Sequence, residues 1–242
     1  MKKLYEKSEI TFAIMWIVIY TVCMGNLRQF GDDSPYPMVG LMIISALMYL
    51  CVRLTGTEEY YGLTGRAENS KQMLWFIPLW VISTFNLWCG ISPDYPMPGL
   101  AYAAVMMALV GFAEELIFRG FLFKAMLRGG SVRTAVIVSS VTFGAGHIIN
   151  LFVGQNLTET LMQVVFAVAM GFIFTMVFYK SGSLWPGILA HSFIDVASVF
   201  ASGGSPLLDW ILHILTLVLS AGYCLYLAKK VETPRINRIA RE

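Results

Sequence analysis

Hydrophobic positions along the chain gather into long continuous runs, unlike the short alternating segments of a closed β-barrel. Each run has about the 20 residues that a helix needs to cross a bilayer. A helix also satisfies its own backbone hydrogen bonds in lipid, so these runs predict membrane-spanning α-helices. The eight predicted helices cover residues 10–27, 37–55, 73–92, 98–127, 134–153, 159–179, 183–201 and 208–228. The pattern predicts an all-α, polytopic membrane protein.

Basic residues fall almost entirely on one face of the membrane when alternate loops are assigned to alternate sides. Of the 17 Lys and Arg residues, only Arg28 falls on the other face. The residues that share a face are Lys2, Lys3, Lys7, Arg53, Arg66, Lys71, Arg119, Lys124, Arg128, Arg133, Lys180, Lys229, Lys230, Arg235, Arg238 and Arg241. Short cytoplasmic loops collect Lys and Arg, so this partition predicts an even number of crossings with both termini in the cytoplasm.

The composition excludes an ordinary soluble domain. Of the 242 residues, 57% are hydrophobic and 13% are charged, against about 25% charged in soluble domains. A net charge of +2 does not indicate a nucleic-acid-binding protein. Residues 1–242 show no repeat or soluble linker, so we expect a single transmembrane domain, and the pattern does not define its oligomeric state. Four cysteines stand singly in apolar runs and are predicted to be buried free thiols: Cys23, Cys51, Cys89 and Cys224.

Ionisable side chains within the predicted helices are candidates for function, because a charge near the bilayer centre costs about 2.5–3.5 kcal/mol. They are Glu114, Glu115 and Arg119 in the fourth helix, His147 in the fifth, and His191 with Asp195 in the seventh. A rise of about 1.5 Å per residue puts Glu114 about 21 Å from the cytoplasmic end if the fourth helix continues to Arg128. His147 lies at a similar depth. A helix ending at Arg119 would instead bring Glu114 within about 8 Å of that end.

Helical spacing separates the roles of the two neighbouring carboxylates. Residues four apart share a face, so Arg119 is expected to pair with Glu115 as a structural ion pair. Glu114 is turned about 100° away and is left free. A carboxylate beside an imidazole can take a proton from water, and a second imidazole can stabilise the resulting oxyanion. The chain has no GxSxG or HExxH motif, so water is the expected nucleophile.

Three short motifs follow one another on separate predicted helices. Glu114 to Arg119 has the form EExxxR, Phe143 to His147 the form FxxxH, and His191 to Asp195 the form HxxxN/D. In this order they resemble the CAAX-protease and bacteriocin-processing (CPBP) family, which are intramembrane glutamic endopeptidases related to the Ras-converting endopeptidase. The resemblance covers roughly residues 111–196, the motif core.

The resemblance implies a peptidase in which Glu114 and His147 activate water, while His191 and Asp195 form the oxyanion-stabilising side. An ionised Asp195 cannot donate to an oxyanion, so we expect it to orient His191 as an imidazolium. No cofactor is implied. The implied partners are membrane lipids and a membrane-associated peptide or protein substrate, in a bacterial cell membrane, with bacteriocin maturation or self-immunity as a setting.

Other interpretations stay open at this point. Glu114, His147 and His191 offer a ligand set for a zinc-dependent protease. The same residues would serve a transporter or proton relay, or a non-catalytic scaffold. Each motif also has a plain structural interpretation, as charges reaching the interface, an interhelical hydrogen bond or an i,i+4 pair. In the eighth helix, Asp209 and His213 are predicted to form such a pair near the outer end.

Overall fold

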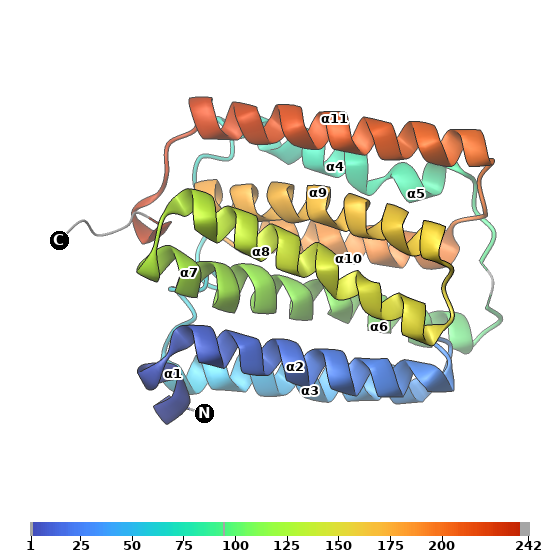
Figure 1. The fold of residues 1–242 in the computed structure, drawn as a ribbon, viewed down its shortest axis with the longest axis horizontal. Helices are drawn as coiled ribbons and strands as arrows, with labels where there is room; N and C mark the ends of the chain where they lie inside the picture. The colour runs from blue at the N-terminus through green and yellow to red at the C-terminus, as the bar shows by residue number, and fades with distance from the viewer. Residues whose placement is uncertain (1, 94, 238–242) are drawn as a thin grey trace.

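The chain folds into a bundle of antiparallel helices, seen in a computed structural model that describes residues 2–93 and 95–237 (Figure 1). The all-α prediction is confirmed. The α-helices are α1 (Lys2–Lys7), α2 (Glu9–Leu27), α3 (Pro35–Thr55), α4 (Ile77–Ser83), α5 (Phe85–Trp88), α6 (Gly99–Glu115), α7 (Lys124–Gly129), α8 (Val132–Gly146), α9 (Leu157–Ser181), α10 (Trp185–Phe200) and α11 (Pro206–Lys230). Short 3-10 or π turns join them: η1 (Arg28–Phe30), η2 (Leu74–Phe76), η3 (Leu116–Phe123), η4 (His147–Val153) and η5 (Arg235–Asn237).

Six helical segments of the described chain are long and apolar enough to cross a membrane. They are Glu9–Phe30, Pro35–Thr55, Gly99–Gly129, Val132–Phe152, Leu157–Ser181 and Pro206–Lys230. The protein is therefore a multi-pass membrane protein. Two of the eight predicted crossings correspond instead to shorter apolar helices, Leu74–Ser83 and Trp185–Phe200.

The two ends of the bundle are built differently. α1 and residues 231–237 lie at one end, which we call the terminal end (Figure 1). The connections 28–34, 89–93 with 95–98, 147–156 and 201–205 lie at the other, which we call the loop end. α2 runs from the terminal end to the loop end, and α3 and α6 both run in the opposite direction, because α4 and α5 lead the chain back between them (Figure 1). Of the predicted cytoplasmic residues, Arg238 and Arg241 lie outside the described residues.

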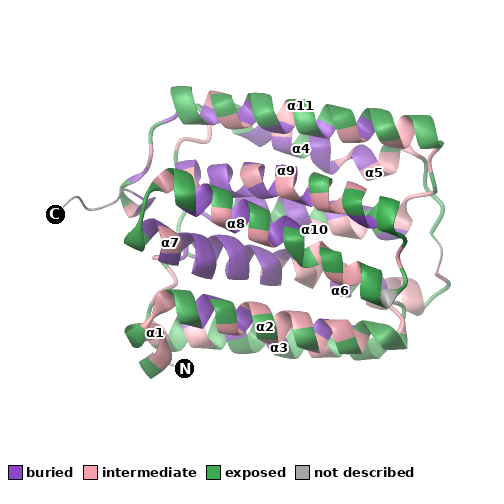
Figure 2. Cartoon of the chain, in the orientation of Figure 1, coloured by how far each residue is buried: buried purple, intermediate pink, exposed green. Residues whose placement is uncertain are grey.

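The helix that carries the first motif is continuous from Gly99 to Gly129, so the alternative of an end at Arg119 is wrong. A π-helical stretch, η3, joins α6 to α7 without breaking it, and all eight of its residues are buried (Figure 2). Ser139 of α8 donates its hydroxyl to the carbonyl oxygen of Phe118 within this stretch, at 2.9 Å. Glu114 therefore lies about 22 Å from either end of the 31-residue segment, near its middle.

The predicted third helix, 73–92, is wrong as a single element. Leu74, Trp75 and Phe76 have positive φ angles of 53°, 50° and 61°, a left-handed conformation that an α-helix cannot contain. The chain turns there before α4 begins at Ile77, and it turns again at Thr84 before α5. The apolar composition correctly indicated helical structure in this segment, but hydrophobic periodicity alone could not show where the helix is interrupted.

α10 is 16 residues long and packs most extensively against α6. The two helices meet closely at Gly111, where an added Cβ would lie 2.4 Å from the backbone nitrogen of Ser192. Ser192 also donates its hydroxyl to the carbonyl oxygen of Ala108, at 2.7 Å. Only glycine permits this approach, which brings the first and third motifs side by side.

Two buried lysines hold the chain that follows α11 against the terminal end. Lys124 donates to the carbonyl oxygen of Ile236 at 2.8 Å and to the side chain of Asn237 at 3.0 Å. Lys180 donates to the carbonyl oxygen of Val231 at 2.6 Å and to Thr233 at 3.2 Å. These bonds satisfy ammonium groups that burial would otherwise leave without acceptors. Residues 231–237 form a strap across α7 and α9.

The cysteine prediction is correct in one respect and wrong in another. All four cysteines are free, as expected, but each is half-buried rather than buried. Each cysteine lies on a helix or at a helix end that neighbouring helices cover only partly. Apolar neighbours in the sequence do not show whether a residue is fully or only partly buried.

Candidate active site

One cavity of about 240 Å³ collects residues from all three motifs. Glu114 reaches it from α6, His147 from the end of α8, and His191 with Asp195 from α10. Further lining residues come from α2, η1, η4 and α9. The sequence places these side chains more than 30 residues apart between motifs, and antiparallel packing gathers them near the bilayer centre.

Glu115 sits at the most buried point of the site. Its Oε1 accepts a hydrogen bond from Arg119 at 2.9 Å, and both side chains are almost fully buried. The same oxygen lies 3.0 Å from Nδ1 of His191. The guanidinium of Arg119 stacks 4.2 Å above the ring centre of Phe143, a cation–π contact that stabilises a desolvated charge. The predicted contact between Glu115 and Arg119 is present. Glu115 also contacts the imidazole of His191 on another helix, and spacing within one helix could not predict that contact.

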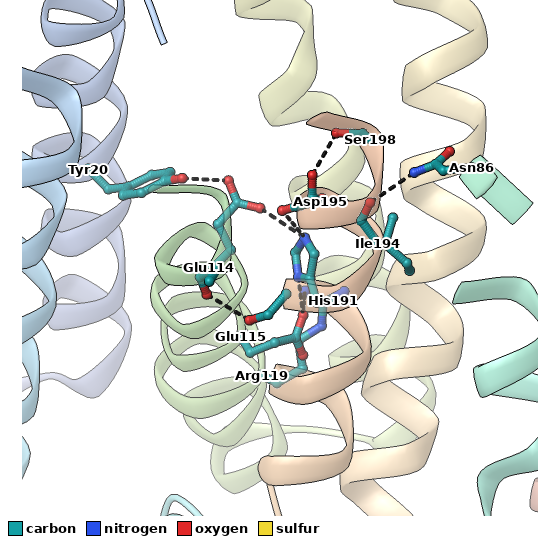
Figure 3. Close-up of polar contacts among 11 residues, drawn as sticks. Tyr20, Asn86, Glu114, Glu115, Arg119, His191, Ile194, Asp195 and Ser198 are labelled. Carbon is teal, nitrogen blue, oxygen red and sulfur yellow. Dashed lines mark hydrogen bonds and ion pairs between the residues drawn. The ribbon is translucent and has the colours of Figure 1, made fainter. Parts of the chain in front are cut away.

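The other nitrogen of His191 faces two further carboxylates (Figure 3). Its Nε2 lies 3.6 Å from Oε2 of Glu114 and 3.4 Å from Oδ2 of Asp195. The ring also stacks on Phe174, with centroids 5.1 Å apart. The contact with Asp195 agrees with the expectation that this carboxylate orients the ring, and the contact of Nδ1 with Glu115 adds a second orienting group. Three carboxyl groups surround one imidazole and one guanidinium.

Glu114 divides its two oxygens between different surroundings. Oε1 accepts a hydrogen bond of 2.8 Å from the hydroxyl of Tyr20 on α2 (Figure 3). Oε2 is buried, has no hydrogen-bond partner and faces His191. An unpartnered carboxylate oxygen at the base of a cavity is an unfavourable arrangement unless a small polar molecule occupies the space. This oxygen therefore has an unfilled acceptor position beside the imidazole of His191.

Tyr20 is the contact that sequence reasoning missed. It lies 94 positions before Glu114, outside all three motifs, and a tyrosine in an apolar helix resembles any other interfacial aromatic residue. Arg28, which also lines the cavity, was noticed only as an exception to the charge pattern. Asn150 and Gln163 line the cavity as well and are linked by a 2.8 Å hydrogen bond. No periodic pattern distinguished them.

His147 lines the same cavity but lies apart from the carboxylate cluster. Its ring packs against Phe143, with centroids 5.5 Å apart, and Phe143 in turn packs against His191 at the same distance. α8 gives way to the 3-10 turn η4 at this residue. The imidazole in contact with Glu114 is thus that of His191, while His147 faces the cavity from another wall.

A metal site would need several of these donors around one point. In the part of the chain that the structure describes, no group of three or more His, Cys, Asp or Glu side chains is arranged to hold a metal ion. Four donors do line the cavity, but the closest pairs already contact one another or buried cations. The expectation of a reaction without a cofactor stays a prediction.

Asp209 and His213 do not form the predicted side-chain pair. His213 donates Nδ1–H to the backbone carbonyl of Asp209 at 2.7 Å, while the carboxylate of Asp209 accepts from the thiol of Cys89 at 3.6 Å. The ring and the carboxylate line a second cavity, of about 480 Å³, at the loop end. The i,i+4 spacing was correct, but the ring nitrogen bonds to the backbone carbonyl of Asp209 instead of to its carboxylate.

Comparison with known proteins finds a family model that matches part of the chain. Residues 96–197 match the family model of the type II CAAX prenyl endopeptidase Rce1-like proteins. Residues 96–197 are Rce1-like. The match contains all three motifs and the continuous helix that carries Glu114. The recognition based on those motifs is confirmed.

The Rce1-like assignment agrees with a relative among curated proteins. "Putative membrane peptidase YdiL" of Bacillus subtilis (strain 168) is 26% identical over 186 residues, which is 74% of this chain and 62% of the relative. The chain thus spans less than two thirds of that protein's length. No solved structure matches the chain. Tyr20 and Arg28 lie outside the Rce1-like segment, yet they complete its cavity.

Proposed function

We propose that the protein is an intramembrane endopeptidase of the glutamic type, in which Glu114 activates a water molecule. The observation that carries this proposal is the buried, unpartnered Oε2 of Glu114, which faces Nε2 of His191 at the base of a cavity. The Rce1-like match and the membrane-peptidase relative support hydrolysis of a peptide bond. The contact geometry supports water as the nucleophile.

In the proposed mechanism, Oε2 of Glu114 takes a proton from water and the hydroxide attacks the scissile carbonyl carbon. The carbonyl oxygen becomes an oxyanion, which accepts a hydrogen bond from Nε2–H of His191. Glu115 holds Nδ1–H of the same ring, and Asp195 balances its charge, so His191 acts as an imidazolium. When the intermediate collapses, Glu114 returns the proton to the leaving amine. His147, which also lines the cavity, contacts the water or the substrate.

The proposed substrate is a membrane-associated peptide or protein, bound among lipids. A cavity of about 240 Å³ has room for a few side chains rather than a folded domain. Maturation of a secreted peptide, including a bacteriocin precursor, or self-immunity to one, fits a small membrane protease of this kind. The cavity alone does not select among such peptides.

We also propose that the chain crosses the membrane eight times, with the terminal end in the cytoplasm. α4 with α5 and α10 would supply the two crossings beyond the six long helices. α10 spans about 24 Å, which is most of a hydrocarbon core about 30 Å thick, and it is surrounded by other helices. Arg119 is buried and does not count toward orientation, but the described basic residues of the connections still favour this direction.

The test compares bacterial cells that express the native chain or the Glu114→Gln variant, with mass spectrometry of membrane and secreted peptide termini. The variant preserves size but removes the base, so at least one new terminus is expected to disappear. Glu59→Gln, on an exposed loop carboxylate, is the matched control and is expected to change nothing. Identical termini in both cell types would refute the peptidase. If cells that express Glu114→Gln keep the phenotype of cells that express the native chain, the non-catalytic scaffold would be favoured.

A further inference from the structure

The cavity that contains Glu114 extends toward only one end of the bundle. α2 contributes Tyr20, Thr21, Met24 and Gly25, which lie in its second half, and Arg28 follows at the loop end. The residues from α8, η4, α9 and α10 also lie in the parts of those elements nearest the loop end (Figure 1). The lining therefore runs from the bilayer centre toward the loop end.

Exposure rises along the same direction. The side chains of His191 and Glu114 are 7% and 11% exposed, that of Asp195 is 22% exposed, and that of Arg28 is 41% exposed. Ser198, one turn beyond Asp195 on α10, is exposed and also lines the cavity. Side-chain exposure is lowest at the base of the cavity and highest at its rim, so the cavity opens at the loop end.

The opposite direction is closed by aromatic side chains. Phe121 of η3 packs edge-on against Phe12 and Tyr61, with ring centroids 5.0 and 5.1 Å apart, and Trp16 lies 6.4 Å from Phe12. All four are almost fully buried. They lie between the carboxylate cluster and the terminal end, where close-packed rings leave no path for an extended peptide.

The rim carries polar groups that suit a peptide backbone in water. Arg28 is held by two hydrogen bonds to Asp32, at 2.8 and 2.6 Å. Asn150 donates to Gln163, and these two amides offer further donors and acceptors of the kind that pair with peptide groups. Gln163 also lines the second cavity at the loop end, so polar space continues beyond the rim.

We propose that the catalytic cavity receives its peptide from the loop end, which lies outside the cytoplasm. The substrates would then be membrane-anchored or exported peptides that present an extended scissile segment on the extracytoplasmic side, rather than cytoplasmic protein tails. This inference rests on the proposed function and on the proposed orientation of the terminal end.

The test measures water access to the rim, which does not require activity. Cys23, Cys51, Cys89 and Cys224 are replaced by alanine, and single cysteines are then introduced as Ser198→Cys or Asn150→Cys. A membrane-impermeant trimethylammonium methanethiosulfonate labels spheroplasts and, separately, inverted vesicles. Leu207→Cys, in the first turn of α11, is the loop-end control, and Arg133→Cys, in the first turn of α8, is the terminal-end control.

Both rim cysteines are expected to react about tenfold or more faster in spheroplasts than in inverted vesicles, like Leu207→Cys, because the bilayer excludes a fixed charge. Arg133→Cys is expected to show the reverse ratio. Faster labelling of the rim in inverted vesicles, or no labelling from either side, would overturn the inference. If Glu114→Gln leaves all peptide termini unchanged, the peptidase fails while the measured side of access stands.

Discussion

Replacing Tyr20 with phenylalanine removes one oxygen atom from the site and leaves the ring in place. That oxygen donates the 2.8 Å hydrogen bond to Oε1 of Glu114. The bond fixes the rotation of the carboxylate, so that Oε2 is the oxygen that faces His191. In the variant, the carboxylate loses this donor and its alignment. We therefore expect a loss of turnover rather than of substrate affinity.

The magnitude follows from the kind of bond that is lost. A hydrogen bond to a charged group contributes about 1.5–3 kcal/mol, and each 1.36 kcal/mol changes a rate tenfold. If the full free energy of the bond stabilises the transition state, a fall in kcat of about 10- to 150-fold is expected. KM should stay within about twofold, because the hydroxyl is committed to Glu114 rather than to substrate.

The assay uses the purified protein in proteoliposomes and, as substrate, the peptide that remains uncut in Glu114→Gln cells. Initial rates give kcat and KM, and thermal unfolding confirms that the variant is folded. Thr21→Val changes the adjacent cavity-lining residue of α2 by a similar amount and is expected to keep most of the activity. If Tyr20→Phe is folded and its kcat equals that of the native chain, the assigned role of this contact is wrong.

Four further outcomes follow from the structure. Gly111→Ala places a Cβ 2.4 Å from α10 and should lower stability by about 1–3 kcal/mol or more in thermal unfolding, whereas Gly222→Ala, with open space around it, should not. Glu115→Gln leaves the buried charge of Arg119 uncompensated and should cost about 3–5 kcal/mol, so unchanged stability would contradict the ion pair. Asp195→Asn preserves shape and can donate to an oxyanion, so it should retain measurable cleavage, whereas Asp195→Leu should abolish it. Chelators should leave the rate of purified protein unchanged, and inhibition reversed by Zn²⁺ would instead favour the metal-dependent alternative.

The sequence predicted well those features that depend on composition and on spacing within one helix. Long apolar runs identified the six long helices, and i,i+4 spacing identified the contact between Glu115 and Arg119. The continuation of the motif helix past Arg119 was also the preferred prediction, because the residues that follow are apolar. These features need only local information.

Contacts between helices were harder to predict, because they depend on packing that a linear pattern does not contain. The hydrogen bond from Tyr20 and the contact of Glu115 with His191 each join distant segments. The broken third segment depends on left-handed backbone at Leu74 to Phe76, which apolar residues rarely adopt. The bond from His213 to the backbone of Asp209 lies within one helix, but a rule based on side-chain spacing does not consider backbone acceptors.

The strap formed by residues 231–237 links the segment after α11 to the helix that carries Glu114. Lys124 belongs to the same continuous segment as Glu114, and its ammonium group depends on acceptors supplied by Ile236 and Asn237. Proteolytic trimming at Lys230 would strip those acceptors and leave two buried cations unsolvated. Affinity tags and reporter fusions joined there therefore need to retain the strap, or they will report on a loosened bundle instead of the native fold.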